Sequence, residues 1–178
     1  MKLQKPGADL TMKHLQHAEQ FGRRLPQKQR DLMSLYIQHV KAELLDLDIE
    51  AVMETLSDDP EYFFYGLGAA QPAPFRGIEA ARALYLRSFE AGTGQSAMLE
   101  TTRFVIDDNS LVVEGTIVTS GGRVATLFPA TKDFIDTSRD AVLSKHVVTL
   151  FPIVGNRFAG ETVFFGGPYQ ADDVHYLD

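Results

Sequence analysis

Near the end of the chain, four polar side chains that can do chemistry stand in an otherwise apolar stretch. The stretch covers residues 140–168, DAVLSKHVVTLFPIVGNRFAGETVFFGGP, and its polar members are Lys145, His146, Thr149 and Glu161. Two β-branched, apolar runs predict two strands joined by a tight turn. Such polar groups need partners when they are buried, because an unpaired polar group is costly away from water. The strand pair is therefore expected to form either the floor of a pocket or the middle of a structural sheet.

Strand alternation separates these polar residues into two sets, because successive side chains of a strand point to opposite faces. One face holds Lys145 and Thr149, and the other holds His146. A shift of one residue exchanges the two faces. Imidazole titrates in the range useful for catalysis, so His146 is a candidate acid or base if its face lines the pocket. Its alternative role is that of a hydrogen-bonded residue on the other face of the sheet.

The elements that must position these residues are helices first and strands last. Helical spacing of apolar residues, or a capping residue before a short apolar run, predicts helices over 11–24, 27–45, 49–56 and 78–91. An aromatic run and period-two alternation predict strands over 62–65, 98–106, 111–119 and 124–127, followed by the two strands of residues 140–168. This order predicts an α+β fold and not the alternation of a parallel sheet.

A curved antiparallel sheet with the helices over its concave face would bury the apolar helix stripes. It would also leave a cavity where the sheet bends away from them. We expect three segments: a basic, partly helical N-terminal extension over 1–26, a single α+β domain over 27–168, and a C-terminal tail over 169–178. His39, near the edge of the second helix, is expected to be a hydrogen-bonded structural residue.

Composition excludes several classes of function. The chain of 178 residues has no cysteine, so disulfides, thiolate metal sites and cysteine nucleophiles are absent. The five histidines show no metal-ligand spacing and there is no nucleotide-binding loop, so we expect neither metal nor cofactor. No apolar run approaches the roughly 18 residues of a membrane span, and the N-terminus lacks the apolar stretch of a secretion signal. We therefore expect a cytoplasmic protein without membrane contact.

Charge is unevenly distributed. The first 30 residues hold seven of the 17 basic residues and two of the 24 acidic ones. Such a segment either binds nucleic acid or an acidic lipid, or lies on the acidic remainder of its own domain or of a partner subunit. No aromatic residue except Phe21 accompanies the basic ones, which favours the second interpretation. We therefore expect no nucleic-acid partner.

Three stretches resemble the nuclear transport factor 2-like superfamily, in particular its SnoaL-like and ketosteroid isomerase-like members. They are LLDLDIEAVMETLSDD for the helix pair, FRGIEAARALYLRSF for the third helix and VVTLFPIVGNRFAGETVFF for the terminal hairpin. The resemblance implies a cone-shaped half-barrel with a pocket between the sheet and the helices, and commonly a homodimer formed through the sheet. Members of the superfamily include isomerases, cyclases, dehydratases, epoxide hydrolases and non-catalytic binding proteins, so the fold assigns no reaction by itself.

The catalytic residues of ketosteroid isomerases are not matched. The position of the family's general base holds Phe64, and its oxyanion tyrosine and aspartate fall close to Val40 and Val147. Proton transfer beside a carbonyl needs a base and an oxyanion donor. The chain is therefore not expected to be a steroid isomerase of the standard kind.

The same resemblance favours one strand register. If Val147 faces the pocket, Lys145 and Thr149 face it too, and a turn centred on Gly155 sets Thr149 opposite Glu161. Glu161 is then the leading acid or base, and the alternative is a plain contact between Lys145 or Thr149 and Glu161 inside the sheet. The candidate catalytic residues are Glu161, His146 and Lys145. The candidate pocket residues are Tyr36, Val40, Tyr62, Phe64, Val147, Thr149, Val163 and Phe165.

We therefore expect a cofactor-free lyase or isomerase, of cyclase or dehydratase type, that acts on a small apolar organic molecule by acid–base catalysis. The alternative is a non-catalytic protein of the same fold that binds a small ligand or only dimerises. An enzyme of this kind needs at least two polar groups that converge within an apolar cavity.

Overall fold

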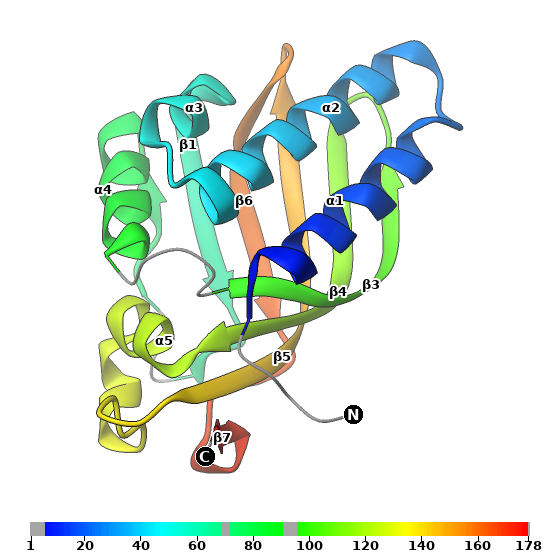
Figure 1. The fold of residues 1–178 in the computed structure, drawn as a ribbon. Coiled ribbons are helices and arrows are strands. Elements are labelled where there is room, and N and C mark those ends of the chain that lie inside the picture. The colour runs from blue at the N-terminus through cyan, green and yellow to red at the C-terminus, as the bar shows by residue number, and fades with distance from the viewer. Residues whose placement is uncertain (1–5, 69–71, 91–95, 178) are drawn as a thin grey trace.

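In the computed structural model, the chain folds into a curved sheet with helices over its concave face (Figure 1). The structure describes residues 6–68, 72–90 and 96–177. The helical elements are α1 (Ala8–Gly22), α2 (Gln27–Lys41), the π-helical turn η1 (Ala42–Asp46), α3 (Ile49–Glu54), α4 (Ile78–Phe89), α5 (Gly121–Leu127) and the 3-10 turns η3 (Pro129–Asp133) and η4 (Ala171–Asp173). The strands are β1 (Leu56–Tyr65), β2 (Phe75–Arg76), β3 (Ser96–Ile106), β4 (Ser110–Ser120), β5 (Ala141–Val154), β6 (Arg157–Phe165) and β7 (Val174–Tyr176).

The sheet is mixed. Its strand order is β2-β1-β6-β5-β4-β3, with β7 paired to one end of β5. The hairpins β3–β4 and β5–β6 are antiparallel because short turns connect them. β1 pairs parallel with β6, although all the other pairs are antiparallel. The predicted curved α+β architecture is present. The parallel pairing of β1 with β6 was not predicted, because these strands are far apart in the chain and no hairpin connects them.

Two predicted local structures differ from those observed. Residues 124–127, predicted as a short strand, belong to helix α5. The Ser120 hydroxyl accepts the backbone N–H of Arg123 and caps that helix, a signal that outweighs four residues of alternation. The C-terminal residues, predicted as a tail, form η4 and β7, and Leu143 on β5 pairs with Val174.

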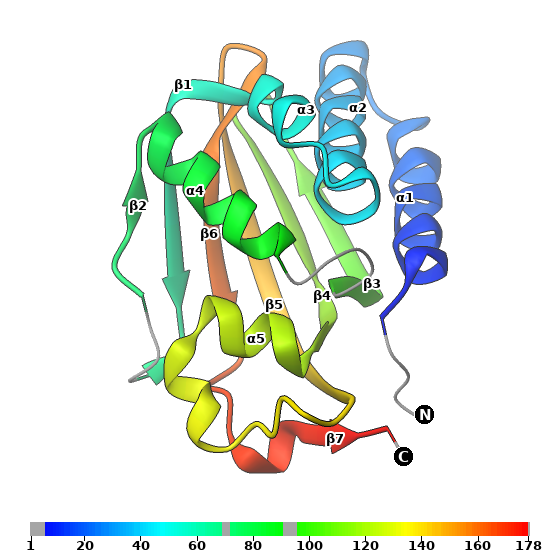
Figure 2. The same ribbon diagram turned by 60° about the vertical axis from the view of Figure 1, so that its left-hand side comes forward.

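The main core lies between the helices and the concave face of the sheet (Figure 2). Its buried members come from helices and strands alike, and include Met33, Tyr36, Val52, Tyr62, Leu84, Leu111, Phe151 and Phe158. Leu15 and Ala18 of α1 are buried in the same core, and α1 packs against α2 and β3. The helix of the basic N-terminal segment is therefore part of the packed domain.

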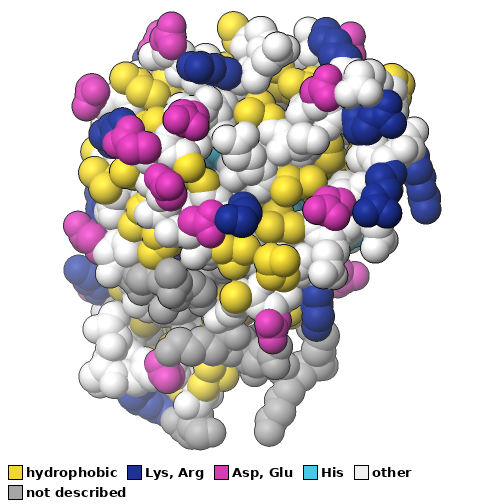
Figure 3. Space-filling model, turned by 45° about the horizontal axis from the view of Figure 1, so that its top comes forward, with side chains coloured by type: hydrophobic (Ala, Val, Ile, Leu, Met, Phe, Trp, Pro, Cys, Tyr) yellow, Lys and Arg dark blue, Asp and Glu magenta, His cyan; other side chains and the backbone are white. Residues whose placement is uncertain are grey.

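Surface charge on the helical side is mixed. In Figure 3, basic side chains gather toward the side where α1 lies, and acidic ones are more frequent toward the opposite side. Lys28 forms an ion pair with Asp108 (3.0 Å) in the turn that connects β3 and β4. No helix in the described part of the chain has both the length and the apolar character needed to span a bilayer.

Gly160 allows β1 to approach β6 closely, one residue before Glu161. Its φ is +107°, and a Cβ added there would lie 1.9 Å from the Glu61 carbonyl oxygen. The pairing of the two strands shifts register in this region, between Leu56 and Glu61. A side chain at position 160 therefore meets both backbone strain and a steric clash with β1.

Replacing Gly160 with alanine should destabilise the protein by about 3 kcal/mol or more, because the clash is with backbone and the φ is positive. Gly122→Ala is the matched control, since a Cβ at Gly122 meets nothing within 4 Å. Urea unfolding followed by circular dichroism measures both variants. Equal stability of the two variants would contradict the close approach of β1 and β6.

Candidate functional site

A cavity of about 180 Å³ lies between the helices and the concave face of the sheet. Its apolar wall includes Val40, Phe64, Val113, Val147, Val163 and Phe165. Its polar side chains are those of His14, Tyr36, Glu43, Arg123, Thr149 and Glu161, together with Ser96 and Thr119 near the start of β3. Tyr62 contributes to a smaller adjoining cavity, which Glu43, Arg123 and Glu161 also line.

Thr149 and Glu161 both face the main cavity, but they are not opposite one another. Thr149 pairs with Val163 for two reasons: the turn pairs Val154 with Arg157 and so is not centred on Gly155, and a register shift between Leu150 and Ile153 adds one more residue. The prediction that set Thr149 opposite Glu161 assumed a regular turn and was wrong by two residues.

Lys145 does not reach the cavity. Its Nζ lies 2.6 Å from Asp173 Oδ2 and 5.6 Å from the centre of the Tyr169 ring. Both partners belong to the C-terminal residues that fold back onto β5. Lys145 therefore holds the end of the chain in place, and the prediction of a Lys145–Glu161 contact is corrected.

His146 lies on the opposite, outer face of the sheet. Its side chain is 51% exposed, and its Nε2 lies 3.3 Å from Glu114 Oε1. Arg103 also pairs with Glu114 (2.6 Å). The alternation of β5 directs His146 away from the cavity, so of its two predicted positions it takes the one on the outer face, where its polar partner is Glu114.

Glu161 is the end point of a buried chain of hydrogen bonds. The Tyr85 hydroxyl of α4 donates to Glu161 Oε1 (2.8 Å). Because that hydrogen is used, the contact of 3.1 Å between the two tyrosine oxygens is a donation from Tyr62 to Tyr85. Burial and the nearby Glu161 charge raise the pKa of both phenols well above 10, so both remain neutral donors.

His39 stands behind Glu161, and its side chain is only 1% exposed. The Thr55 hydroxyl donates to the Val52 carbonyl (2.6 Å), so its oxygen accepts from His39 Nδ1 (2.6 Å). Nδ1 therefore carries a hydrogen, and Nε2 is the nitrogen that faces the site. His39 is hydrogen-bonded, as expected, but it also contacts the leading catalytic candidate.

The contact between His39 and Glu161 has room for one shared proton. His39 Nε2 is 3.3 Å from Glu161 Oε1 and 3.1 Å from the Tyr85 oxygen. The Tyr85 hydrogen already points to Glu161, so a bare Nε2 would face only lone pairs. The contact is favourable when either Nε2 or the carboxyl group carries a hydrogen. With a shared proton, the pair is an imidazolium with a carboxylate, or a neutral imidazole with a carboxylic acid.

Glu43 and Arg123 form a second polar pair at the cavity. Arg123 Nη2 donates to Glu43 Oε1 (2.9 Å), and the side chains are only 7% and 19% exposed. Burial raises the pKa of Glu43, and the charge of Glu161 raises it further, although Arg123 opposes both effects. Glu43 lies in the π-helical turn η1, a local structure that is frequent at functional sites.

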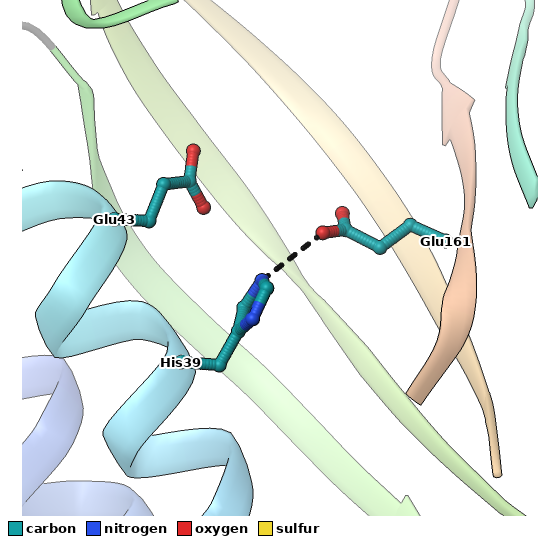
Figure 4. A group of neighbouring side chains, drawn as sticks. All are labelled: His39, Glu43 and Glu161. Atoms are coloured by element: carbon teal, nitrogen blue, oxygen red, sulfur yellow. Dashed lines mark hydrogen bonds and ion pairs between the residues drawn. The ribbon is translucent and has the colours of Figure 1, made fainter. Parts of the chain in front are cut away.

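Three of these groups are close enough to hold one metal ion. His39, Glu43 and Glu161 each offer one ligand atom, and these atoms lie within 4.8 Å of one another. Figure 4 shows the three side chains pointing into one space between the helix and β6. The arrangement can therefore move a proton or bind a cation.

Sequence reasoning missed Tyr85, Glu43 and Arg123 as site residues. His39 and Glu43 are four residues apart, which on a helix directs both to the same face. That spacing was the available signal. Tyr85 and Arg123 had no visible partner in the sequence, because their contacts are distant along the chain.

A second polar cluster occupies another part of the cavity wall. His14 on α1 contacts the Tyr36 hydroxyl through Nε2 and the Thr101 hydroxyl through Nδ1, both at 2.7 Å. Burial and the neighbouring His17 lower the pKa of His14 from 6.5 to about 4. His14 is therefore neutral at pH 7, and α1 supplies a polar residue to the cavity.

Comparison with solved structures identifies the fold. A SnoaL-like polyketide cyclase, so described, from Shewanella putrefaciens superposes with a TM-score of 0.61 at 12% identity, over 93% of this chain and 90% of that one. An NTF2-like protein from Burkholderia xenovorans gives 0.56 at 12% identity, over 82% and 93%. An epoxide hydrolase from M. tuberculosis gives 0.52 at 16% identity, over 82% and 87%.

These similarities show that the chain has the nuclear transport factor 2-like fold. The identities are too low to transfer an activity. No family model matches the sequence, and no curated protein matches it. The chemistry of the site has to be argued from its own residues.

The free energy of unfolding should fall as the pH drops from about 6.5 to 4. In this range His14 binds a proton in the unfolded chain but stays neutral in the folded protein, where its pKa is about 4. This difference is worth up to about 3 kcal/mol. In urea unfolding at pH 7 and pH 4.5, His14→Gln should lose less stability on acidification than wild type. His175→Gln, an exposed histidine, is the control. An equal acid loss in His14→Gln and wild type would contradict the buried neutral imidazole.

Proposed function

We propose that the protein is a lyase or isomerase of acid–base type that acts on a small, mostly apolar organic molecule bound in the cavity. The observation that carries the proposal is the position of Glu161. Its carboxyl group faces an apolar cavity while Tyr85 and His39 contact it from behind. A carboxyl group in such surroundings can exchange a proton with a bound molecule.

Glu161 is the proposed acid or base, because it alone of the His39–Tyr85–Glu161 group lines the main cavity. Tyr85 and His39 are proposed as positioning residues. Tyr85 fixes Oε1 by its hydrogen bond, and His39 holds the proton that the pair shares. In proton abstraction the hydrogen moves from the bound molecule to Glu161, and the electron pair of the broken bond stays on that molecule.

The Arg123–Glu43 pair supports this chemistry from the same cavity. A guanidinium group stabilises negative charge that develops on a substrate oxygen, and it does so more strongly where water is excluded. Glu161 and Arg123 thus supply the two converging polar groups that an acid–base enzyme requires. A protein that only binds a ligand has no need of this buried proton-sharing network, and that argument favours the enzyme over the alternative.

Replacing Glu161 with glutamine should slow proton exchange by roughly 100-fold or more, because the variant keeps the shape but loses the base. The assay follows deuterium incorporation next to the carbonyl of small apolar ketones by NMR, in protein treated with a chelator. Ketones are first screened for binding to the wild type by ligand-observed NMR. Thr149→Val, which changes another polar group of the cavity, is the control and should stay within about threefold.

Two outcomes contradict the proposed function. Exchange at the wild-type rate in Glu161→Gln would exclude Glu161 as the base. Ketone binding to wild type without any exchange would favour the non-catalytic alternative. For the positioning role, His39→Gln should shift the pH profile of exchange, an effect that a merely structural role does not produce.

We also propose that two copies of the chain associate through the outer face of the sheet. Phe164 lies between two cavity-lining residues of β6, so it points outward, where it is 46% exposed. It stacks on Tyr65, which is 40% exposed, at a centroid distance of 5.2 Å. Val105 on β3 is 55% exposed. Exposed apolar groups of this kind are typical of the centre of an interface.

Light scattering after size-exclusion chromatography should give twice the mass of the chain for wild type, and Phe164→Glu should shift it to the mass of one chain. Leu86→Glu is the control, because Leu86 is similarly exposed (47%) but lies on α4. A monomeric wild type, or equal masses for both variants, would exclude the outer sheet face as the interface.

A further inference from the structure

His39, Glu43 and Glu161 have the geometry of a metal site that includes an open position. His39 Nε2 and Glu161 Oε1 are 3.3 Å apart, which matches the roughly 3.3 Å between ligands of a tetrahedral ion with bonds of about 2.0–2.1 Å. Glu43 lies one helical turn beyond His39, and its carboxylate completes a set of ligand atoms within 4.8 Å.

The lone pairs of His39 Nε2 and of the Glu161 carboxyl group point into the space between these two side chains. His39 Nδ1 is committed to Thr55, so Nε2 presents its lone pair toward the Glu161 carboxyl group. A positive charge between an imidazole nitrogen and a carboxylate, either a proton or a metal ion, makes their contact favourable. The proton described above is one occupant of this position, and a metal ion is the other.

Further contacts hold the ligands in the orientation that a metal site requires. The donation of His39 Nδ1 to Thr55 fixes the tautomer and the ring orientation, as it does for metal-bound histidines in general. Arg123 donates to Oε1 of Glu43, and Tyr85 donates to Oε1 of Glu161, and each of these oxygens keeps a second lone pair that can bind a metal ion. Glu43 and Glu161 both line the main cavity, so a fourth ligand can approach from there.

We propose that His39, Glu43 and Glu161 bind one divalent transition-metal ion such as Zn²⁺, with an open coordination position toward the cavity. One imidazole and two carboxylates suit Zn²⁺, Co²⁺, Mn²⁺ or Fe²⁺, whereas Mg²⁺ and Ca²⁺ prefer oxygen ligands only. The ion takes the place of the proton between His39 and Glu161. The inference goes beyond the proposed function, because the ion occupies the base that proton transfer uses.

Zn²⁺ should bind wild-type, chelator-treated protein at one ion per chain in isothermal titration calorimetry. Titrations in two buffers of different ionisation enthalpy should show proton release, because the ion displaces the shared proton. Co²⁺ should give the visible absorption of a four-coordinate site. Glu43→Gln and Glu161→Gln keep the side-chain shape and should each weaken binding at least tenfold. His146→Gln, with an exposed histidine beside Glu114, is the control and should bind as wild type does.

Failure to bind Zn²⁺ would overturn the proposal, as would binding that is lost in His146→Gln and kept in Glu43→Gln. Wild-type stoichiometry and the Co²⁺ spectrum decide the question even if a variant does not fold. The proposed acid–base function is judged separately, by exchange in chelator-treated protein. Zn²⁺ binding without deuterium exchange into the ketone would contradict the acid–base function alone. Deuterium exchange without Zn²⁺ binding would contradict the metal site alone.

Discussion

The hydrogen bond between Tyr85 and Glu161 is the interaction on which the site depends. Burying a carboxyl group on a strand inside a folded domain costs free energy unless its oxygens accept hydrogen bonds. Tyr85 supplies one donor and His39 supplies or accepts the shared proton, so the cost is met without filling the cavity. The three residues come from α4, α2 and β6, and the curved sheet brings these elements together.

The architecture serves the same requirement. The sheet bends away from the helices. Along the side that faces the sheet, α2 places Tyr36 and His39, and the following turn η1 places Glu43. α5 brings Arg123 to the same cavity from a different direction. Gly160 lets β1 pack closely against β6, and the next residue, Glu161, faces the cavity. The cavity is therefore apolar in its walls and ionisable in one region, which is the pattern of many small-molecule sites.

Much of this fold could be predicted from the sequence, because helical and strand periodicities are strong in α2, α4, β4 and β5. The alternation in β5 also separates Thr149 from His146 correctly by face. What failed depends on distant partners. Lys145 pairs with Asp173 in residues that read as a tail, and His39 meets Glu161 across 122 positions. Local spacing contains no information on such contacts, except for the four-residue separation of His39 and Glu43.

The protonation of His39 tests the account most directly. Nitrogen-15 NMR of the imidazole rings reports which ring nitrogens carry hydrogen. At neutral pH in metal-free protein, His39 Nδ1 should be protonated, with Nε2 either protonated or hydrogen-bonded to the Glu161 carboxyl group, and Glu161→Gln should change the Nε2 signal. A neutral ring with its hydrogen on Nε2 and a bare Nδ1 would contradict the proton-sharing pair, and with it the orientation of the whole site.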